Sequence, residues 1–224
     1  MTTSPSVVLL GASGAVGAEV LARLIKMPQV QRVTVLVRRP IDGIGGDIVR
    51  QVTVDVLDPH AYRHLLDGHD SAICTLGVGQ PSKMSKDEFT RIDRDAVANF
   101  ATACKDVGVA HFELLGSVGA DASSRSFYLR SKGQLSDALV ALKFERLSIF
   151  QPSMILTPTN RYGFSQALTL MLWPILSPLL LGSWRKYRGI RVETLGAAMA
   201  EHLLTSGPPI EILHWDQFVK HAPA

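Results

Sequence analysis

VVLLGASGAVGAEVLARL, residues 7–24, joins an apolar, strand-like run to a helical pattern through a glycine-rich turn. The turn has the spacing GxxGxxG. In such a turn the first glycine permits a sharp bend and the second lets backbone N–H groups approach a pyrophosphate, while the third lets helix and strand pack closely. The alternative is a packing turn that binds nothing. The stretch therefore predicts a nucleotide site formed by Gly11, Ser13, Gly14, Ala15, Val16 and Gly17.

The rest of the chain alternates apolar, β-branched runs with helical patterns, which is typical of a parallel sheet covered on both faces. The expected strands are Ser6–Leu10, Arg32–Arg38, Gln51–Val56, Ser71–Leu76, His111–Gly116, Arg146–Phe150 and Ile210–His214. The expected helices are Val16–Ile25, Ala61–Leu66, Lys86–Val107, Arg130–Lys143, a broken helix over Ser165–Leu181, and Val192–Thr205. The predicted fold class is α/β, a doubly wound parallel Rossmann sheet of about seven strands with helices on both faces and a small C-terminal helical substrate region. We expect one NAD(P)-binding Rossmann domain over residues 1–224, with 154–190 as the substrate or oligomer region.

Composition and charge narrow the partners. The 224 residues carry a net charge of +3, and the 23 basic side chains are scattered among 20 acidic ones, so we expect no nucleic-acid binding. Cys74 and Cys104 lack the spacing of a metal site or a redox pair, and we expect both to be reduced thiols. The first residues lack the basic region and apolar run of a signal peptide. We therefore expect a cytoplasmic protein.

Residues 162–184 form one uncharged stretch that is long enough to cross a bilayer. Pro174 and Pro178 interrupt it, and strand-like sequence on both sides has to reach the same sheet. We therefore expect no membrane span, but a buried or oligomer-facing pair of helices. The expected assembly is a monomer or a homodimer.

The second expected strand indicates which dinucleotide binds. It ends in Arg38 and Arg39, where a chain that binds NAD(H) would carry an acidic residue for the ribose 2′-hydroxyl. Arginine instead attracts a 2′-phosphate, and the hydroxyl of Ser13 could donate to the same group. These residues favour NADP(H) over NAD(H), although arginines at strand ends are also ordinary surface residues. Asp55 lies at the carboxyl end of the third expected strand and Gly77 follows the fourth, where they could meet the adenine and the ribose or could equally be turn residues.

Three polar side chains follow the fifth expected strand, in the sequence GSVGADASSRSFYLRSK of residues 116–132. Ser117 lies at the end of the strand, and Tyr128 and Lys132 are spaced to share one helix face. A tyrosine ordinarily has a pKa of about 10, and a neighbouring ammonium lowers it by favouring the phenolate. The lysine can also hydrogen-bond a nicotinamide ribose, and the serine can polarise a carbonyl. A lone YxxxK is common as a surface pair, so its place after a Rossmann strand carries the prediction.

Together, GASGAVG, the strand-end Asp55, LLGSVGAD, YLRSK and QPSMI resemble the atypical short-chain dehydrogenase/reductase family, in its branch of Tat-interacting-protein-like NAD(P)-binding oxidoreductases. The resemblance covers essentially the whole chain. It implies a Rossmann fold that binds NADP(H), with Tyr128 as general acid/base, Lys132 as its partner and Ser117 as the hydroxyl that orients the substrate. It also implies further cofactor contacts, at Val56, Leu76, Pro152, Ser153 and Met154.

The chain departs from the family's pattern at a few positions. Gly116 stands where the branch often has another serine, and Gln151 replaces an arginine that is common before the proline. The helix before the fifth strand offers Asp93 and Asn99, but no clear counterpart of the asparagine that completes a proton relay in the wider superfamily.

These residues favour an NADP(H)-dependent oxidoreductase that transfers a hydride between nicotinamide and a small, largely apolar carbonyl or alcohol. One alternative is a non-catalytic NAD(P)H-binding module for regulation or protein interaction. Another is an isomerase or epimerase, which the lack of a large C-terminal sugar domain disfavours. The seven histidines show no metal-ligand spacing, so we expect no metal site.

Overall fold

Seven parallel strands form the central sheet of the computed structural model, which describes residues 4–78, 84–158 and 180–222. The strands are β1 (Ser6–Leu10), β2 (Arg32–Val37), β3 (Val49–Thr53), β4 (Ser71–Cys74), β5 (His111–Leu115), β6 (Arg146–Phe150) and β9 (Ile210–Leu213). Their order across the sheet is β3-β2-β1-β4-β5-β6-β9, and every neighbouring pair is parallel. The predicted doubly wound sheet is therefore confirmed.

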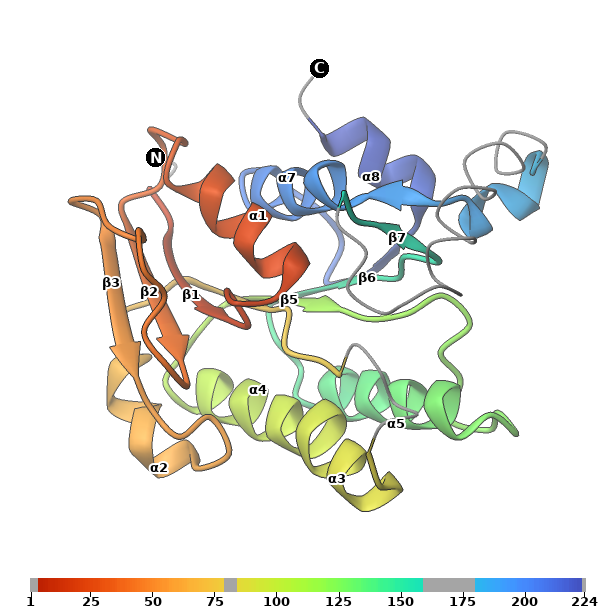
Figure 1. Cartoon of the computed structure of the whole chain (residues 1–224), viewed down its shortest axis with the longest axis horizontal. Coiled ribbons are helices and arrows are strands. Elements are labelled where there is room, and N and C mark those ends of the chain that lie inside the picture. Colours follow the sequence, from red (N-terminus) through yellow and green to blue (C-terminus); the bar gives the residue numbers. More distant parts are fainter. Residues whose placement is uncertain (1–3, 79–83, 159–179, 223–224) are drawn as a thin grey trace.

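Helices cover both faces of this sheet (Figure 1). Helices α1, α7 and α8 lie on one face, and α3, α4 and α5 lie on the other. The helices are α1 (Ala15–Leu24), α2 (Pro59–Tyr62), α3 (Lys86–Thr90), α4 (Ala96–Asp106), α5 (Phe127–Ala141), α7 (Val192–His202) and α8 (Trp215–His221). Shorter elements are the 3-10 turns η1 (Arg63–Leu65) and η5 (Gly182–Tyr187), the π-helical turn η3 (Arg91–Asp95), and the two-residue strands β7 (Ile155–Leu156) and β8 (Ile190–Arg191).

Two apolar cores, one on each face, hold the layers together. Val20, Leu195 and Met199 pack between the sheet and the helices α1 and α7. Phe100 and Leu135 pack against the opposite face from α4 and α5. Because both faces are covered, an inner strand can be a continuous apolar run rather than an alternating one. The β1 sequence SVVLL, for example, is buried at every position.

The structure differs from the expected element boundaries in a few places. The strand expected over Gln51–Val56 runs instead over Val49–Thr53, because the chain turns at Asp55, whose carboxylate accepts from the amide of Leu57 at 2.9 Å. The helix expected from Arg130 begins at Phe127, because Ser126 caps it. Helix α8 and the short pair β7 and β8 were not expected. The predicted broken helix over 165–181 lies almost entirely outside the described residues.

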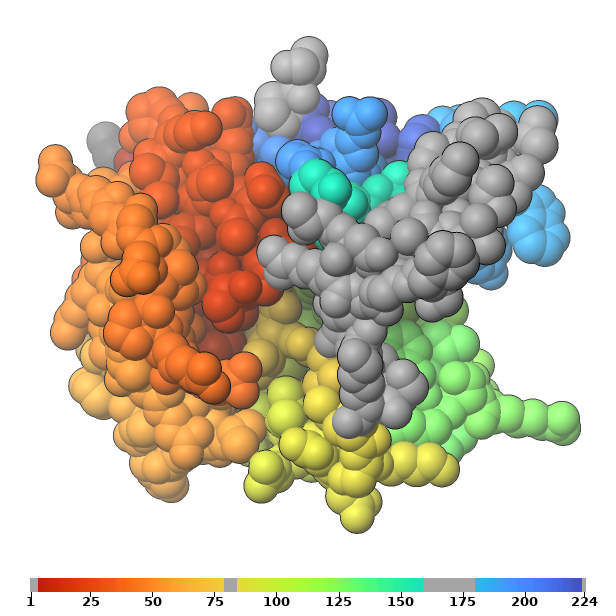
Figure 2. Space-filling model, viewed as in Figure 1, coloured from red at the N-terminus to blue at the C-terminus, as the bar shows by residue number. Residues whose placement is uncertain are grey.

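The carboxyl ends of the strands meet at one edge of the sheet. The order of the strands reverses between β1 and β4, and ligands of doubly wound folds bind at such a switch point. Figure 2 shows the surface hollowed between the N-terminal part of the chain, in red, and the segment that follows β4, in yellow. The fold therefore places the glycine-rich turn and the segments after β4, β5 and β6 around one region.

Candidate functional site

A cavity of about 320 Å³ opens at the switch point. Its lining comes from the start of α1, the segment after β4, the π-helical turn, the end of β5, helix α5 and the segment after β6. The lining residues are Gly14, Ala15, Val16, Thr75, Leu76, Gly77, Val78, Asp93, Leu115, Gly116, Tyr128, Lys132, Ser153, Ile155 and Thr157. The cavity thus brings together eight of the residues predicted from the sequence. A larger hollow, of about 590 Å³, lies around Arg32 and Asp70 and contains none of them.

The three glycines of the opening turn have different reasons for being glycine. Gly11 has a φ of +100°, and a Cβ there would lie 2.6 Å from the backbone of Leu76. At Gly17 a Cβ would collide with the carbonyl oxygen of Gly11. Gly14 is less crowded, and it is the one that lines the cavity. Two of the glycines therefore serve close packing, and the middle one faces the cavity.

The start of α1 lacks a side-chain cap. Ser85 and Ser126 accept hydrogen bonds from the first turns of α3 and α5, whereas no described side chain caps α1, whose N-cap is Gly14. The first N–H groups of a helix need an acceptor, and the helix dipole favours an anionic one. Because Ala15 and Val16 line the cavity, this end of α1 is suited to a pyrophosphate.

Tyr128 and Lys132 both lie on α5 and both face the cavity, as their spacing predicts. The Tyr128 ring packs against the buried ring of Phe89, with 6.0 Å between centroids. The ammonium of Lys132 lies 5.9 Å from the centroid of the Tyr128 ring. The phenol and the ammonium are therefore neighbours in one wall.

Lys132 also forms a buried ion pair that the sequence analysis did not assign. Its Nζ lies 2.7 Å from Oδ2 of Asp93, and the two side chains are only 6% and 1% exposed. Burial alone would lower the pKa of Lys132, but the carboxylate of Asp93, together with Tyr128 and Cys74, raises the pKa above its ordinary value. The signal that could have revealed Asp93 is its place on the buried stripe of the expected helix, between Phe89 and Val97.

Ser117 follows β5 and is half-buried, but it is not among the residues that line the cavity. Its loop is anchored on both sides. The amide of Val118 donates to the carbonyl of Pro152 at 3.0 Å, and the amide of Asp121 donates to the carbonyl of Leu129 at 3.1 Å. A Cβ on Gly133 of α5 would collide with this loop, so the glycine allows the loop to approach the helix.

The residues predicted to hold the adenosine half follow β1, β2 and β3. Ser13, Arg38, Arg39 and Asp55 are all exposed, and neither arginine forms an ion pair with a described carboxylate. Asp55 is a turn residue in this structure, since its Oδ1 accepts from the amide of Leu57. The other predicted member, at position 56, is a buried valine of the core, so only its backbone could face a cofactor.

After β6, Ser153 lines the cavity, whereas Pro152 and Met154 are not among its lining residues. Pro152 and Met154 use their carbonyl groups within the fold, where they accept from Val118 and Ile190. This segment therefore runs beside the cavity, and contacts of Pro152 and Met154 with nicotinamide stay a prediction.

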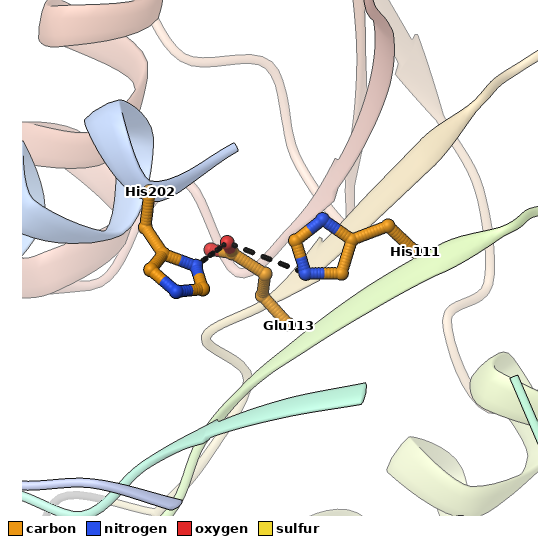
Figure 3. A group of neighbouring side chains, drawn as sticks. All are labelled: His111, Glu113 and His202. Carbon is orange, nitrogen blue, oxygen red and sulfur yellow. Dashed lines mark hydrogen bonds and ion pairs between the residues drawn. The ribbon is translucent and has the colours of Figure 1, made fainter. Parts of the chain in front are cut away.

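A second group of titratable side chains lies outside the cavity, where β5 meets α7 (Figure 3). Nδ1 of His202 lies 2.8 Å from Oε1 of Glu113, and Nε2 of His111 lies 3.7 Å from the same oxygen. These ligand atoms are close enough together to hold a metal ion. The hydrogen bonds around them indicate otherwise.

Both nitrogens that face Glu113 carry protons in this network. The guanidinium of Arg146 can only donate, so Nε2 of His202 accepts from it at 2.9 Å and the proton of His202 resides on Nδ1. Ser148 donates its hydroxyl proton to Glu211 and therefore accepts from Nε2 of His111 at 2.9 Å. A metal ligand needs a free lone pair, so this pattern favours protons over a metal.

Comparisons with known proteins agree with this geometry. A family model described as NAD(P)H-binding matches residues 11–147. The chain is 33% identical over 204 residues to the protein HTATIP2 of Rattus norvegicus, across 90% of this chain and 82% of that one. It is 32% identical over 152 residues to the protein FMP52, named mitochondrial, of Debaryomyces hansenii, across 67% of each chain.

Solved structures resemble the fold at lower identity. MoeE5 in complex with UDP-glucuronic acid and NAD has a TM-score of 0.71 at 15% identity, covering 93% of this chain and 75% of that one. The enzyme WbmH of Bordetella bronchiseptica in complex with NAD+ has a TM-score of 0.69 at 16% identity, covering 94% and 75%. Within the described ranges, no helix has the length and apolar character needed to cross a membrane.

Proposed function

This chain belongs to the NAD(P)H-binding family of atypical short-chain dehydrogenases/reductases, and on that premise we propose that it is an NADP(H)-dependent oxidoreductase acting on a small, largely apolar carbonyl or alcohol. One observation carries the proposal. The uncapped start of α1 and the Tyr128–Lys132 pair line the same cavity, so a dinucleotide seated on the helix can extend toward a phenol and an ammonium.

The residues of the cavity fit a dinucleotide. The pyrophosphate would accept from the N–H groups at the start of α1, where the backbone of Gly14 is open. Gly77 supports the same fit, because a Cβ there would approach Oδ1 of Asp93 to 3.1 Å and narrow the cavity. The exposed pair Arg38 and Arg39 supports the choice of NADP(H), since a 2′-phosphate would meet two cations without a competing described carboxylate.

The proposed chemistry divides between cofactor and protein. Bound NADPH supplies the hydride. Tyr128 donates the proton from its hydroxyl to the substrate oxygen, and it takes the proton back in the reverse direction. Lys132 stabilises the phenolate and donates to the ribose, and Ser117 orients the carbonyl. The apolar lining by Leu115 and Ile155 supports a modest apolar substrate.

Equilibrium binding of NADPH and NADH to the purified protein tests which dinucleotide is the cofactor. NADPH should bind more tightly than NADH, and Arg38→Ala with Arg39→Ala should remove that preference. The variant Arg50→Ala changes an exposed arginine of the adjacent strand β3 and should leave the preference intact. Tighter binding of NADH by the wild-type protein would contradict the choice of NADP(H).

A panel of carbonyl compounds, followed by the absorbance of NADPH, tests the reaction. Tyr128→Phe should lose on the order of a hundredfold or more in rate, the usual scale for a positioned acid/base. Tyr62→Phe is the matched control, because its hydroxyl is buried in the core without a partner among the described residues. If NADPH binds but no carbonyl compound is reduced, the result would favour the alternative, a non-catalytic NAD(P)H-binding module for regulation or protein interaction.

A further inference from the structure

Asp93 is a charged side chain in the wall of the cavity whose two oxygens have different partners. Oδ2 lies 2.7 Å from Nζ of Lys132. Oδ1 accepts from the backbone amide of Val78 at 2.9 Å. A buried carboxylate is unfavourable unless its charge is paired, and here the ammonium pairs with Oδ2 while Oδ1 accepts a hydrogen bond.

The local backbone explains how Asp93 reaches these partners. It lies in the five-residue π-helical turn Arg91–Asp95, between α3 and α4, and it is the buried residue of that turn. A π-helical turn inserts extra backbone into a helix and is frequent at functional sites. Across the gap, Gly77 leaves space, because a Cβ there would lie 3.1 Å from Oδ1 of Asp93 and 3.7 Å from Nζ of Lys132.

We propose that Asp93 is a positioning residue of this site: one oxygen keeps Lys132 in place as an ammonium, and the other fixes the cavity wall at Val78. This role deepens the proposed function and rests on it. Asp93 acts through Lys132 and the backbone rather than on the reacting atoms.

The protonation state of Lys132 depends on the charge of Asp93. Because Lys132 is buried, desolvation favours the neutral amine, and among the described residues Asp93 is the one carboxylate within ion-pair distance. The other titratable groups that act on Lys132 are Tyr128, on the same helix, and the buried thiol of Cys74, at the end of β4. Both are neutral in their ordinary states, so the counter-charge depends on Asp93.

Two substitutions separate the two contacts. Asp93→Asn keeps an oxygen for the amide of Val78 and removes the charge beside Lys132. Asp93→Ala removes both contacts. Asp95→Asn is the matched control, since that carboxylate belongs to the same turn but is half exposed and pairs with Arg94.

The first measurement follows the titration of Lys132 by ¹³C NMR of lysine side chains without cofactor, with Lys132→Met to assign the signal. In Asp93→Asn, Lys132 should lose its proton at a lower pH than in the wild-type protein and in Asp95→Asn. This readout needs no substrate and no NADPH, so it decides the link between the two residues even if the proposed reaction fails.

The second measurement compares NADPH affinity at about pH 6.5 and about pH 9, on either side of neutrality. Between the lower and the higher pH, the NADPH affinity of Asp93→Asn should fall on the order of tenfold more than that of the wild-type protein, because Lys132 loses its proton. At the higher pH it should approach the affinity of Lys132→Met. Identical titration of Lys132 with and without Asp93 would overturn the proposal. So would normal behaviour of Asp93→Asn with a defect confined to Asp93→Ala, which would make Asp93 merely structural. Absence of NADPH binding by the wild-type protein would refute the proposed function instead.

Discussion

His111 should make the fold sensitive to mild acid. Its ring is buried at the start of β5, where its Nε2–H donates to Ser148 at 2.9 Å. Burial, together with the positive charge of Arg146 and the neighbouring ring of His202, lowers the pKa of His111 from 6.5 to about 3. The unfolded chain therefore takes up a proton below about pH 6.5 that the folded protein refuses, and stability is lost as the pH falls from there toward 3.

The magnitude follows from the size of that shift. At pH 5 the unfolded state gains about 1.5 pH units of protonation free energy over the folded state, or about 2 kcal/mol at 1.36 kcal/mol per unit. His111→Gln removes the titration, and the amide of glutamine can still donate to Ser148. The free energy of unfolding of the wild-type protein should therefore drop by about 2 kcal/mol more than that of His111→Gln between pH 7 and pH 5.

Urea denaturation at both pH values measures the difference. Burial raises the pKa of Glu113, whose protonation favours the folded state in acid, but this contribution is common to both proteins and cancels in the comparison. Exposed His64 provides the matched control, because His64→Gln should follow the wild-type protein. A gap between wild type and His111→Gln that stays constant from pH 7 to pH 5 would refute the reasoning.

Three further predictions concern packing, the buried ion pair and the histidine cluster. Gly133→Ala should lower the free energy of unfolding by about 1–3 kcal/mol, because its Cβ would collide with the backbone after β5, whereas Gly45→Ala, with open space around it, should change it by less than about 0.5 kcal/mol. Lys132→Met should cost about 3–5 kcal/mol by leaving Asp93 buried and unpaired, and adding Asp93→Asn should restore part of that loss; strictly additive losses in urea would contradict the pairing. Elemental analysis of dialysed protein should find well below one bound zinc per chain, and a stoichiometric zinc that is lost in His202→Ala would contradict the hydrogen-bond assignment.

The predictions that succeeded from the sequence rest on local chemistry. The turn at Gly11 needs a left-handed backbone at the end of a strand, and the spacing of Tyr128 and Lys132 puts them on one face of any helix. Strands β1 and β2 are almost entirely buried because helices cover both faces, and their apolar pattern is visible in each run by itself. Such signals need no knowledge of what lies far away in the chain.

What the sequence did not reveal depends on contacts between distant segments. The buried stripe that includes Phe89 and Val97 marks Asp93 as a buried position, but its pairing with Lys132 depends on the π-helical turn and on α5 beside that turn, and neither has a local signature. Gly133 is required because the loop after β5 approaches α5 closely at Asp121 and Ala122. The predicted end of β3 was too late, because Val54 continues the apolar pattern after the last strand pairing at Thr53.

The two buried ionic groups show why only one of them marks a ligand site. Each ring nitrogen of His202 is paired within the protein, Nδ1 with Oε1 of Glu113 and Nε2 with Arg146, so neither ring nitrogen is left to bind anything else. Lys132 has three N–H donors, and its described ion-pair partner is Asp93 alone, while the side chain lines an open cavity. An ammonium held on one side and open on the other still needs acceptors. Under the proposed function these acceptors would be the ribose oxygens of the dinucleotide and the phenol oxygen of Tyr128, which meet at the carboxyl edge of the sheet.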